Sequence, residues 1–189
     1  MHDQSSVFLF HTERLRFRCW STADLDAGLS IWGDPDVMRF VEPPLDAETV
    51  LRSIEAGRRH FERHRCQHWA MVPHTSDTPV GACGFNVFEE ESPGGEFCEG
   101  GPRLEMVFHL SKTVWGQGLA TEAALGALKY AETHLRPAGF VAGVHPGNSA
   151  SARVLEKVGF VAGGMRHFQD TDETLLWFTR LRGPLSGGA

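Results

Sequence analysis

The stretch that decides the fold reads Trp115-Gly116-Gln117-Gly118-Leu119-Ala120-Thr121-Glu122-Ala123, and it joins an apolar run at 103–110 to an alanine-rich segment. Alanines and leucines recur at helical spacing from Ala120 to Leu135, which predicts a helix whose small side chains let it lie close to a sheet. A glycine-rich turn before a helix leaves backbone N–H groups uncovered at the positive end of the helix dipole. The stretch therefore predicts a strand, a turn able to bind an anion such as pyrophosphate, and a helix.

This turn differs from two well-known phosphate loops. It has no Gly-Lys-Ser/Thr, as nucleoside-triphosphate P-loops have, and no Gly-x-Gly-x-x-Gly, as dinucleotide-binding folds have. A Gly-x-Gly by itself also occurs in ordinary tight turns between strands and helices, and that alternative stays open here.

The segments around the turn predict a mixed α/β fold. Downstream, strand, helix, strand and helix alternate, which implies a right-handed crossover between parallel strands. Upstream, period-two alternation and capping residues predict strands and short helices. The predicted strands are 14–18, 68–72, 80–88, 103–110, 140–144, 160–169 and 173–182, and the predicted helices follow the caps Ser21, Asp34, Asp46 and Asn148 or Ser149.

Composition favours a single-domain protein that binds neither nucleic acid nor a membrane. A chain of 189 residues with 41% apolar content suits one core, so we expect one domain at 11–182 with tails at 1–10 and 183–189. The net charge of −6 argues against nucleic acid as a partner, and no apolar run predicts a signal peptide or a membrane span. Four cysteines without a Cys-x-x-Cys pair suit a reduced, cytoplasmic protein.

Several segments resemble a known family. Residues 105–110 with 115–123 resemble motif A of the GNAT acetyltransferases, and 148–160 resemble motif B. The N-terminal 12–18 and 34–40 resemble the RimJ/RimL-type branch, which acetylates ribosomal-protein N-termini. The resemblance covers residues 11 to 182 and implies the GNAT acyl-CoA N-acyltransferase fold, a mixed and mostly antiparallel sheet in which two parallel strands splay apart at the cofactor site.

The resemblance also implies acetyl-CoA as the acyl donor. The strand at 103–110 would offer its backbone to the pantetheine arm, the glycine turn would hold the pyrophosphate, and Asn148 would contact the cofactor through its side chain. From sequence, Asn148 is equally well a plain helix N-cap. The residues carried over as cofactor-binding are Phe108, His109, Leu110, Gly116, Gln117, Gly118, Leu119, Ala120, Thr121 and Asn148.

Acetyl transfer to an amine calls for a general base, oxyanion stabilisation and an acid for the leaving thiolate. Glu105 stands at a motif A position often held by glutamate and is the candidate base; a glutamate paired with a neighbouring strand, or a base acting through water, is the alternative. Leu155 replaces the usual motif B tyrosine, and the RimL-type pattern then implies Ser151 as the acid. As an alternative, Ser151 is simply a first-turn helix serine.

The acceptor amine cannot be chosen from the sequence. The branch suggests a protein N-terminal amine, while the fold class equally hosts small-molecule acetyltransferases, and the missing tyrosine also suits a non-catalytic acyl-CoA-binding module. A monomer or homodimer is expected. The acidic stretch 89–102 could attract a cationic acceptor, and His145 and His167 are further candidates to assist proton removal.

One cluster of metal-ligand residue types is not expected to bind a metal ion. His60, His64, Cys66 and His68 fall within nine residues, but they are predicted to lie on a helix end and a strand, and we expect no metal site there.

Overall fold

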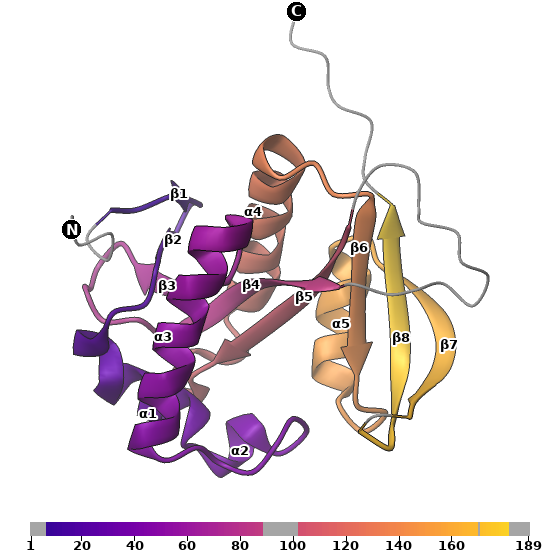
Figure 1. Cartoon of the computed structure of the whole chain (residues 1–189), viewed down its shortest axis with the longest axis horizontal. Coiled ribbons are helices and arrows are strands. Elements are labelled where there is room, and N and C mark those ends of the chain that lie inside the picture. The colour runs from indigo at the N-terminus through magenta and orange to yellow at the C-terminus, as the bar shows by residue number, and fades with distance from the viewer. Residues whose placement is uncertain (1–6, 89–101, 170, 182–189) are drawn as a thin grey trace, which may run out of the picture.

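The computed structural model describes residues 7–88, 102–169 and 171–181 (Figure 1). Its strands form one sheet of eight in the order β1-β2-β3-β4-β5-β6-β8-β7. The strands are β1 (Phe10–His11), β2 (Leu15–Arg18), β3 (His68–Pro73), β4 (Gly81–Phe88), β5 (Arg103–Leu110), β6 (Gly139–Val144), β7 (Val161–Phe168) and β8 (Glu173–Leu181). The helices are η2 (Thr22–Asp24), α1 (Leu25–Trp32), α2 (Pro35–Met38), α3 (Ala47–His64), η3 (Lys112–Val114), α4 (Leu119–His134) and α5 (Ser149–Lys157).

The predicted mixed α/β fold is confirmed. Only β5 and β6 pair in parallel, and α4 is the crossover helix between them; all other pairs in the described sheet are antiparallel. The predicted caps are also in place: the Asp34 and Asp46 side chains accept backbone N–H groups at the starts of α2 and α3. The acidic loop expected at 89–102 lies outside the described residues, apart from Pro102.

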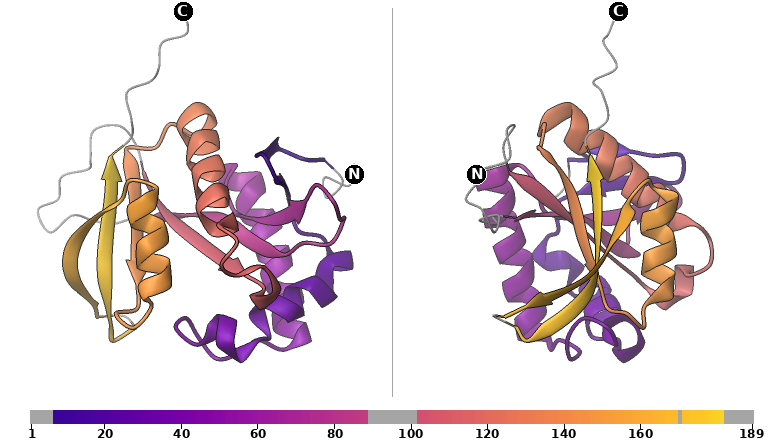
Figure 2. Two further views of the ribbon diagram at one scale, coloured as in Figure 1. Left: turned by 180° about the vertical axis from the view of Figure 1, so that it is seen from behind. Right: turned by 90° about the vertical axis from the view of Figure 1, so that its right-hand side faces the viewer.

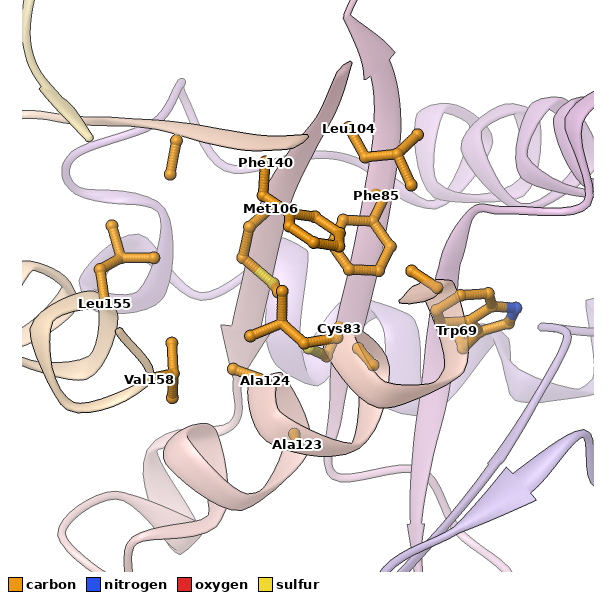
Figure 3. Close-up of a cluster of buried hydrophobic side chains, with 14 of the residues drawn as sticks. Trp69, Cys83, Phe85, Leu104, Met106, Ala123, Ala124, Phe140, Leu155 and Val158 are labelled. Carbon is orange, nitrogen blue, oxygen red and sulfur yellow. The ribbon is translucent and has the colours of Figure 1, made fainter. Parts of the chain in front are cut away.

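Helices cover both faces of the sheet. In Figure 1, α1 and α3 lie in front of the strands, and the view from behind in Figure 2 shows α4 and α5 on the opposite face. The α4/α5 side carries the larger core, part of which Figure 3 shows, with Trp69, Phe85 and Met106 from the sheet and Leu155 from α5. The α1/α3 side has a second core centred on buried side chains such as Ile31 and Val50.

The first strand begins one residue before the predicted domain start at 11. Residues 1–10 were expected to be a tail, yet Phe10 lies in β1 and pairs with Phe17 of β2. Its ring stacks on Phe17 with centroids 4.3 Å apart and on Tyr130 of α4 at 4.8 Å. A strand of two residues is too short to show a period-two pattern, so the sequence offered no signal for it.

The parallel pair β5–β6 separates along its length, as the splayed-strand prediction requires. Pairing joins Arg103, Leu104 and Glu105 to 139–141 and then stops. Beyond Glu105, β5 stays paired with β4 as far as Leu110, and β6 stays paired with β8 as far as Val144. The backbone edges that β5 and β6 turn toward each other are therefore without a strand partner in the second half of each strand.

Two further expectations concern the environment of the chain. None of the helices in the described ranges combines the length and apolarity that a membrane crossing requires. Cys19, Cys66 and Cys83 are free and buried, while Cys98 lies outside the described residues.

Candidate active site

The glycine turn places an uncapped helix start beside the end of β5. Gly116 (φ 75°) and Gly118 (φ 77°) adopt left-handed backbone conformations, which glycine reaches without the penalty that a Cβ brings. Gly118 is the N-cap residue of α4 and, in the part of the chain that is described, no side chain caps this helix. The N–H groups of the first turn, Leu119 to Thr121, are thus available to an anion.

The unpaired half of β5 offers its backbone next to this turn. Leu110 and Phe108 pack into the core on the α4/α5 side, whereas the ring of His109 lies on the α1 side. There Nδ1 of His109 accepts a hydrogen bond of 3.2 Å from the indole N–H of Trp32, and burial lowers the pKa of His109 to about 4. His109 is therefore a neutral imidazole with its remaining proton on Nε2.

Glu105 occupies the last paired position before the strands separate. Its neighbours Leu104 and Met106 are buried in the α4/α5-side core, so its side chain projects from the opposite, α1/α3 face. The amide Nδ2 of Asn86 donates to its carboxylate at 3.2 Å, and Oδ1 of the same amide lies 2.9 Å from Nε2 of His68. Burial raises the pKa of Glu105, and the hydrogen bond from Asn86 opposes that rise.

The two motif B candidates lie at the start of α5. The side chain of Asn148 accepts the N–H of Ser151 at 3.1 Å, so its capping role is observed directly. Ser151 precedes the buried Leu155 by one helical turn and shares its face, which looks toward the sheet. Because α4 and α5 follow the ends of β5 and β6, both helix starts lie at the open end of the separating strands (Figure 2, left view).

A hollow of about 400 Å³ lies between α2 with the segment that follows it and two residues of the sheet ends, His145 just after β6 and Glu173 at the start of β8. The ring of Phe40 stacks on His145 just after β6, with centroids 5.1 Å apart. The lining comprises Pro35, Met38, Arg39, Phe40, Val41, Glu42, Pro43, Pro44, His145 and Glu173. Sequence reasoning singled out His145 but missed Phe40, Glu42 and Glu173, because nothing local connects the three segments.

Other candidates lie elsewhere. His167 bonds Thr174 across the β7–β8 hairpin at 3.1 Å and does not line the hollow. Cys66 Sγ lies 3.7 Å from His60 Nε2, while Nε2 of His68 is hydrogen-bonded to Oδ1 of Asn86 instead. Within the described ranges, no group of three or more His, Cys, Asp or Glu side chains could hold a metal ion together.

One residue at the turn was missed altogether. Arg14 donates from Nη1 to the carbonyl oxygen of Gln117 at 3.0 Å and pairs with Glu122 in the first turn of α4. The sequence signalled it only as part of a motif without an assigned role.

Comparison with known proteins agrees with this geometry. A protein-family model described as an acetyltransferase (GNAT) domain matches residues 14–161. The uncharacterized N-acetyltransferase p20 of Bacillus licheniformis is 26% identical over 157 residues, which are 82% of this chain and 83% of that protein. A GNAT-family acetyltransferase structure from Bacillus anthracis gives a TM-score of 0.76 at 21% identity and covers 93% of this chain and 99% of its own.

Three further solved structures, which represent two differently named proteins, have the same fold. AAC(6')-Ib, solved with acetyl-CoA and, separately, with ribostamycin and coenzyme A, gives a TM-score of 0.72 at 14% identity and covers 90% of this chain and 94% of its own. RimL, a ribosomal L7/L12 alpha-N-protein acetyltransferase, also gives 0.72 at 14% identity and covers 93% and 94%. At this identity the likeness shows the fold alone, so the RimJ/RimL-type branch stays a prediction.

Proposed function

The chain belongs to the GNAT acetyltransferase family, and from this premise we propose that it transfers the acetyl group of acetyl-CoA to a primary amine by direct attack of the amine on the thioester. The observation that carries the proposal is the separation of β5 and β6 after Glu105, with an uncapped helix start following β5 and a hollow beside the end of β6. Donor and acceptor can thereby approach the same opening from two sides.

The donor would lie along β5. The pantetheine amides would pair with the backbone edge at 108–110, in place of the missing strand, although the Leu110 carbonyl oxygen already accepts a hydrogen bond of 2.8 Å from the indole N–H of Trp115. The pyrophosphate would accept hydrogen bonds from N–H groups of the turn at 116–121. Asn148 would reach the cofactor only through the part of its amide that does not cap α5.

Glu105 is the proposed general base. A carboxylate whose pKa is raised by burial is better matched to removing a proton near neutral pH than one at its usual value. As the amine attacks the carbonyl carbon, its proton passes to Glu105, directly or through a water. Ser151, at the start of α5, would donate its hydroxyl proton to the coenzyme A thiolate as the carbon–sulfur bond breaks, and would regain a proton from water.

The acceptor would enter the hollow under the α2–α3 segment. Its volume of about 400 Å³ falls in the range of small-ligand sites, which suits a small amine or the first residues of a peptide. Two exposed carboxylates, Glu42 and Glu173, line the hollow against one guanidinium, that of Arg39, which lies over the Phe40 ring at 4.3 Å. This balance of charge favours a cationic amine over an anionic one.

The test measures binding of acetyl-CoA first and acetyl transfer second. Acetyl-CoA is titrated into the protein by calorimetry, and amines and N-terminal peptides are then screened for release of free thiol. We expect saturable binding and amine-dependent release, with kcat reduced at least roughly a hundredfold in Glu105→Gln and roughly tenfold in Ser151→Ala. Glu48→Gln, an exposed carboxylate in an i,i+4 pair on α3, is the control and should keep full activity.

The outcomes separate the alternatives. Absence of acetyl-CoA binding would overturn the proposal as a whole. Binding without thiol release for any amine would support a non-catalytic acyl-CoA-binding module. Release with small amines but not with peptides, or the reverse, selects the acceptor class.

A further inference from the structure

Two residues to which the sequence assigned no role, Arg14 and Glu122, meet at the start of α4. Glu122, in the first turn of α4, receives three hydrogen bonds from the segment before β2, more than a hundred residues earlier. Arg14 donates from Nε at 2.6 Å and from its backbone N–H at 2.8 Å, and the hydroxyl of Thr12 donates at 2.6 Å. Burial alone would raise the pKa of Glu122, but these donors lower it, so the carboxylate is charged.

The same arginine reaches the glycine turn. Its Nη1 donates to the carbonyl oxygen of Gln117 at 3.0 Å, and a Cβ on Gly118 would lie 3.8 Å from its Nη2. The guanidinium therefore lies against the Gln117–Gly118 peptide while its Nε is held by Glu122.

The direction of this peptide matters for binding an anion. In a trans peptide the C=O and the following N–H point in opposite directions, and no peptide bond in the described residues is cis. Because the Gln117 carbonyl points at Arg14, the Gly118 N–H points away from Arg14. A flipped peptide would instead present a carbonyl oxygen, which repels a phosphate. Because Gly118 has no Cβ, sterics alone do not fix the orientation of this peptide. The hydrogen bond from Arg14 can therefore decide which way the peptide faces.

We propose that Arg14, held in place by Glu122 and Thr12, is a positioning residue that orients the Gln117–Gly118 peptide so that the turn presents N–H groups to the pyrophosphate of acetyl-CoA. This inference rests on the proposed function, in which that turn binds the pyrophosphate. The pair is partly exposed, with 48% of the Arg14 side chain accessible, and such pairs contribute little to global stability. Its effect should therefore be found in ligand affinity.

The experiment compares three donors with Arg14→Met. Dissociation constants are measured by calorimetry for acetyl-CoA and acetyl-dephospho-CoA, which both carry the pyrophosphate, and by NMR titration for S-acetylpantetheine, which carries no phosphate. We expect affinity to fall roughly tenfold for the first two and to stay unchanged for the third, the size of effect that one charge-assisted hydrogen bond gives. Arg16→Met is the matched control, since its guanidinium contacts the β3–β4 turn at Ser76 and Asp77.

A second variant tests the network. Glu122→Gln should give the same selective loss, and the double variant should lose little more, because both changes release the same peptide. Equal loss for all three donors, or none for the two pyrophosphate donors, would overturn the role of Arg14. If the wild-type protein binds S-acetylpantetheine as tightly as acetyl-CoA, the pyrophosphate turn itself fails, and that result is distinct from a turn that works without Arg14.

Discussion

At the scale of single residues, the surroundings of Glu105 decide what its carboxylate can do. It is the last residue of β5 that pairs with β6, and its only described side-chain donor is Asn86, whose amide is in turn oriented by His68. Nε2 of the neutral His68 donates to Oδ1, which turns the Nδ2 donor toward Glu105. Burial thus raises the pKa of the proposed base, while Asn86, oriented by His68, favours its charged form.

Changing Asn86 should move the pH profile of the reaction. Asn86→Leu removes a donor that favours the carboxylate, so the pKa of Glu105 rises further and the acidic limb of kcat/KM shifts to higher pH. Asn86→Asp should shift it in the same direction and further, because a like charge is added. The measurement is kcat/KM against pH, and an unmoved acidic limb in both variants would show that another group is the base.

Gly84 of β4 is a residue where no side chain fits. A Cβ there would lie 1.7 Å from the backbone oxygen of Gln67, and this oxygen accepts the N–H of Phe85. Gly84→Ala should lower the free energy of unfolding by about 3 kcal/mol, measured in urea. Gly57→Ala in α3 is the control: a Cβ there would meet a single side-chain atom, Oε1 of Gln67 at 3.3 Å, and helix propensity favours alanine by about 1 kcal/mol. Equal stability of the two variants would contradict this account.

At the scale of elements, a buried ion pair ties β2 to the start of the helical layer. Arg18 of β2 meets Asp24 of η2 through two hydrogen bonds of 2.7 and 2.8 Å, and about a tenth of each side chain is exposed. Burial alone would raise the pKa of Asp24, but the bonds from Arg18 and Ser21 lower it. The pair stays charged and holds η2 against β2.

Removing one partner of this pair should be costly. Arg18→Met leaves the Asp24 charge buried without its partner, and we expect a loss of about 3 kcal/mol in the free energy of unfolding, measured by chemical denaturation. The double variant Arg18→Met/Asp24→Leu should recover part of this loss because no charge is then buried. A loss below about 1 kcal/mol in the single variant would show that water reaches the pair.

At the scale of the whole molecule, stability should depend on the neutral histidines beneath the helices. The pKa values of His68 and His109 are lowered from 6.5 to about 4, chiefly by burial. Between these two values the unfolded chain binds protons that the folded protein does not, so stability falls as the pH falls from about 6.5 to about 4. His109→Gln keeps a hydrogen-bond acceptor for Trp32 but removes one of these two titrating histidines.

The free energy of unfolding of His109→Gln should therefore depend less steeply on pH than that of the wild-type protein. The measurement is the free energy of unfolding of wild type and His109→Gln at several pH values between 4 and 7, and the comparison cancels the groups that both proteins share. Parallel curves would show that His109 is protonated as readily in the folded protein as in the unfolded chain.

The sequence by itself determined most elements and the character of the cofactor turn. The caps at Asp34, Asp46 and Asn148 and the left-handed glycines act within a few residues of chain, so their physical cause is visible locally. The assignment of Glu105 and Ser151 came from resemblance to a family and remains a proposal, although both lie at the separating strands.

Only the tertiary structure decided what surrounds these groups. Arg14 reaches Gln117 across 103 residues of chain, and Trp32 reaches His109 across 77. The hollow brings the segment after α2 together with His145, just after β6, and Glu173, at the start of β8. Each of these contacts depends on sheet order and on which face a side chain takes. Local propensity does not encode them, because they arise only when distant segments pack together and exclude water.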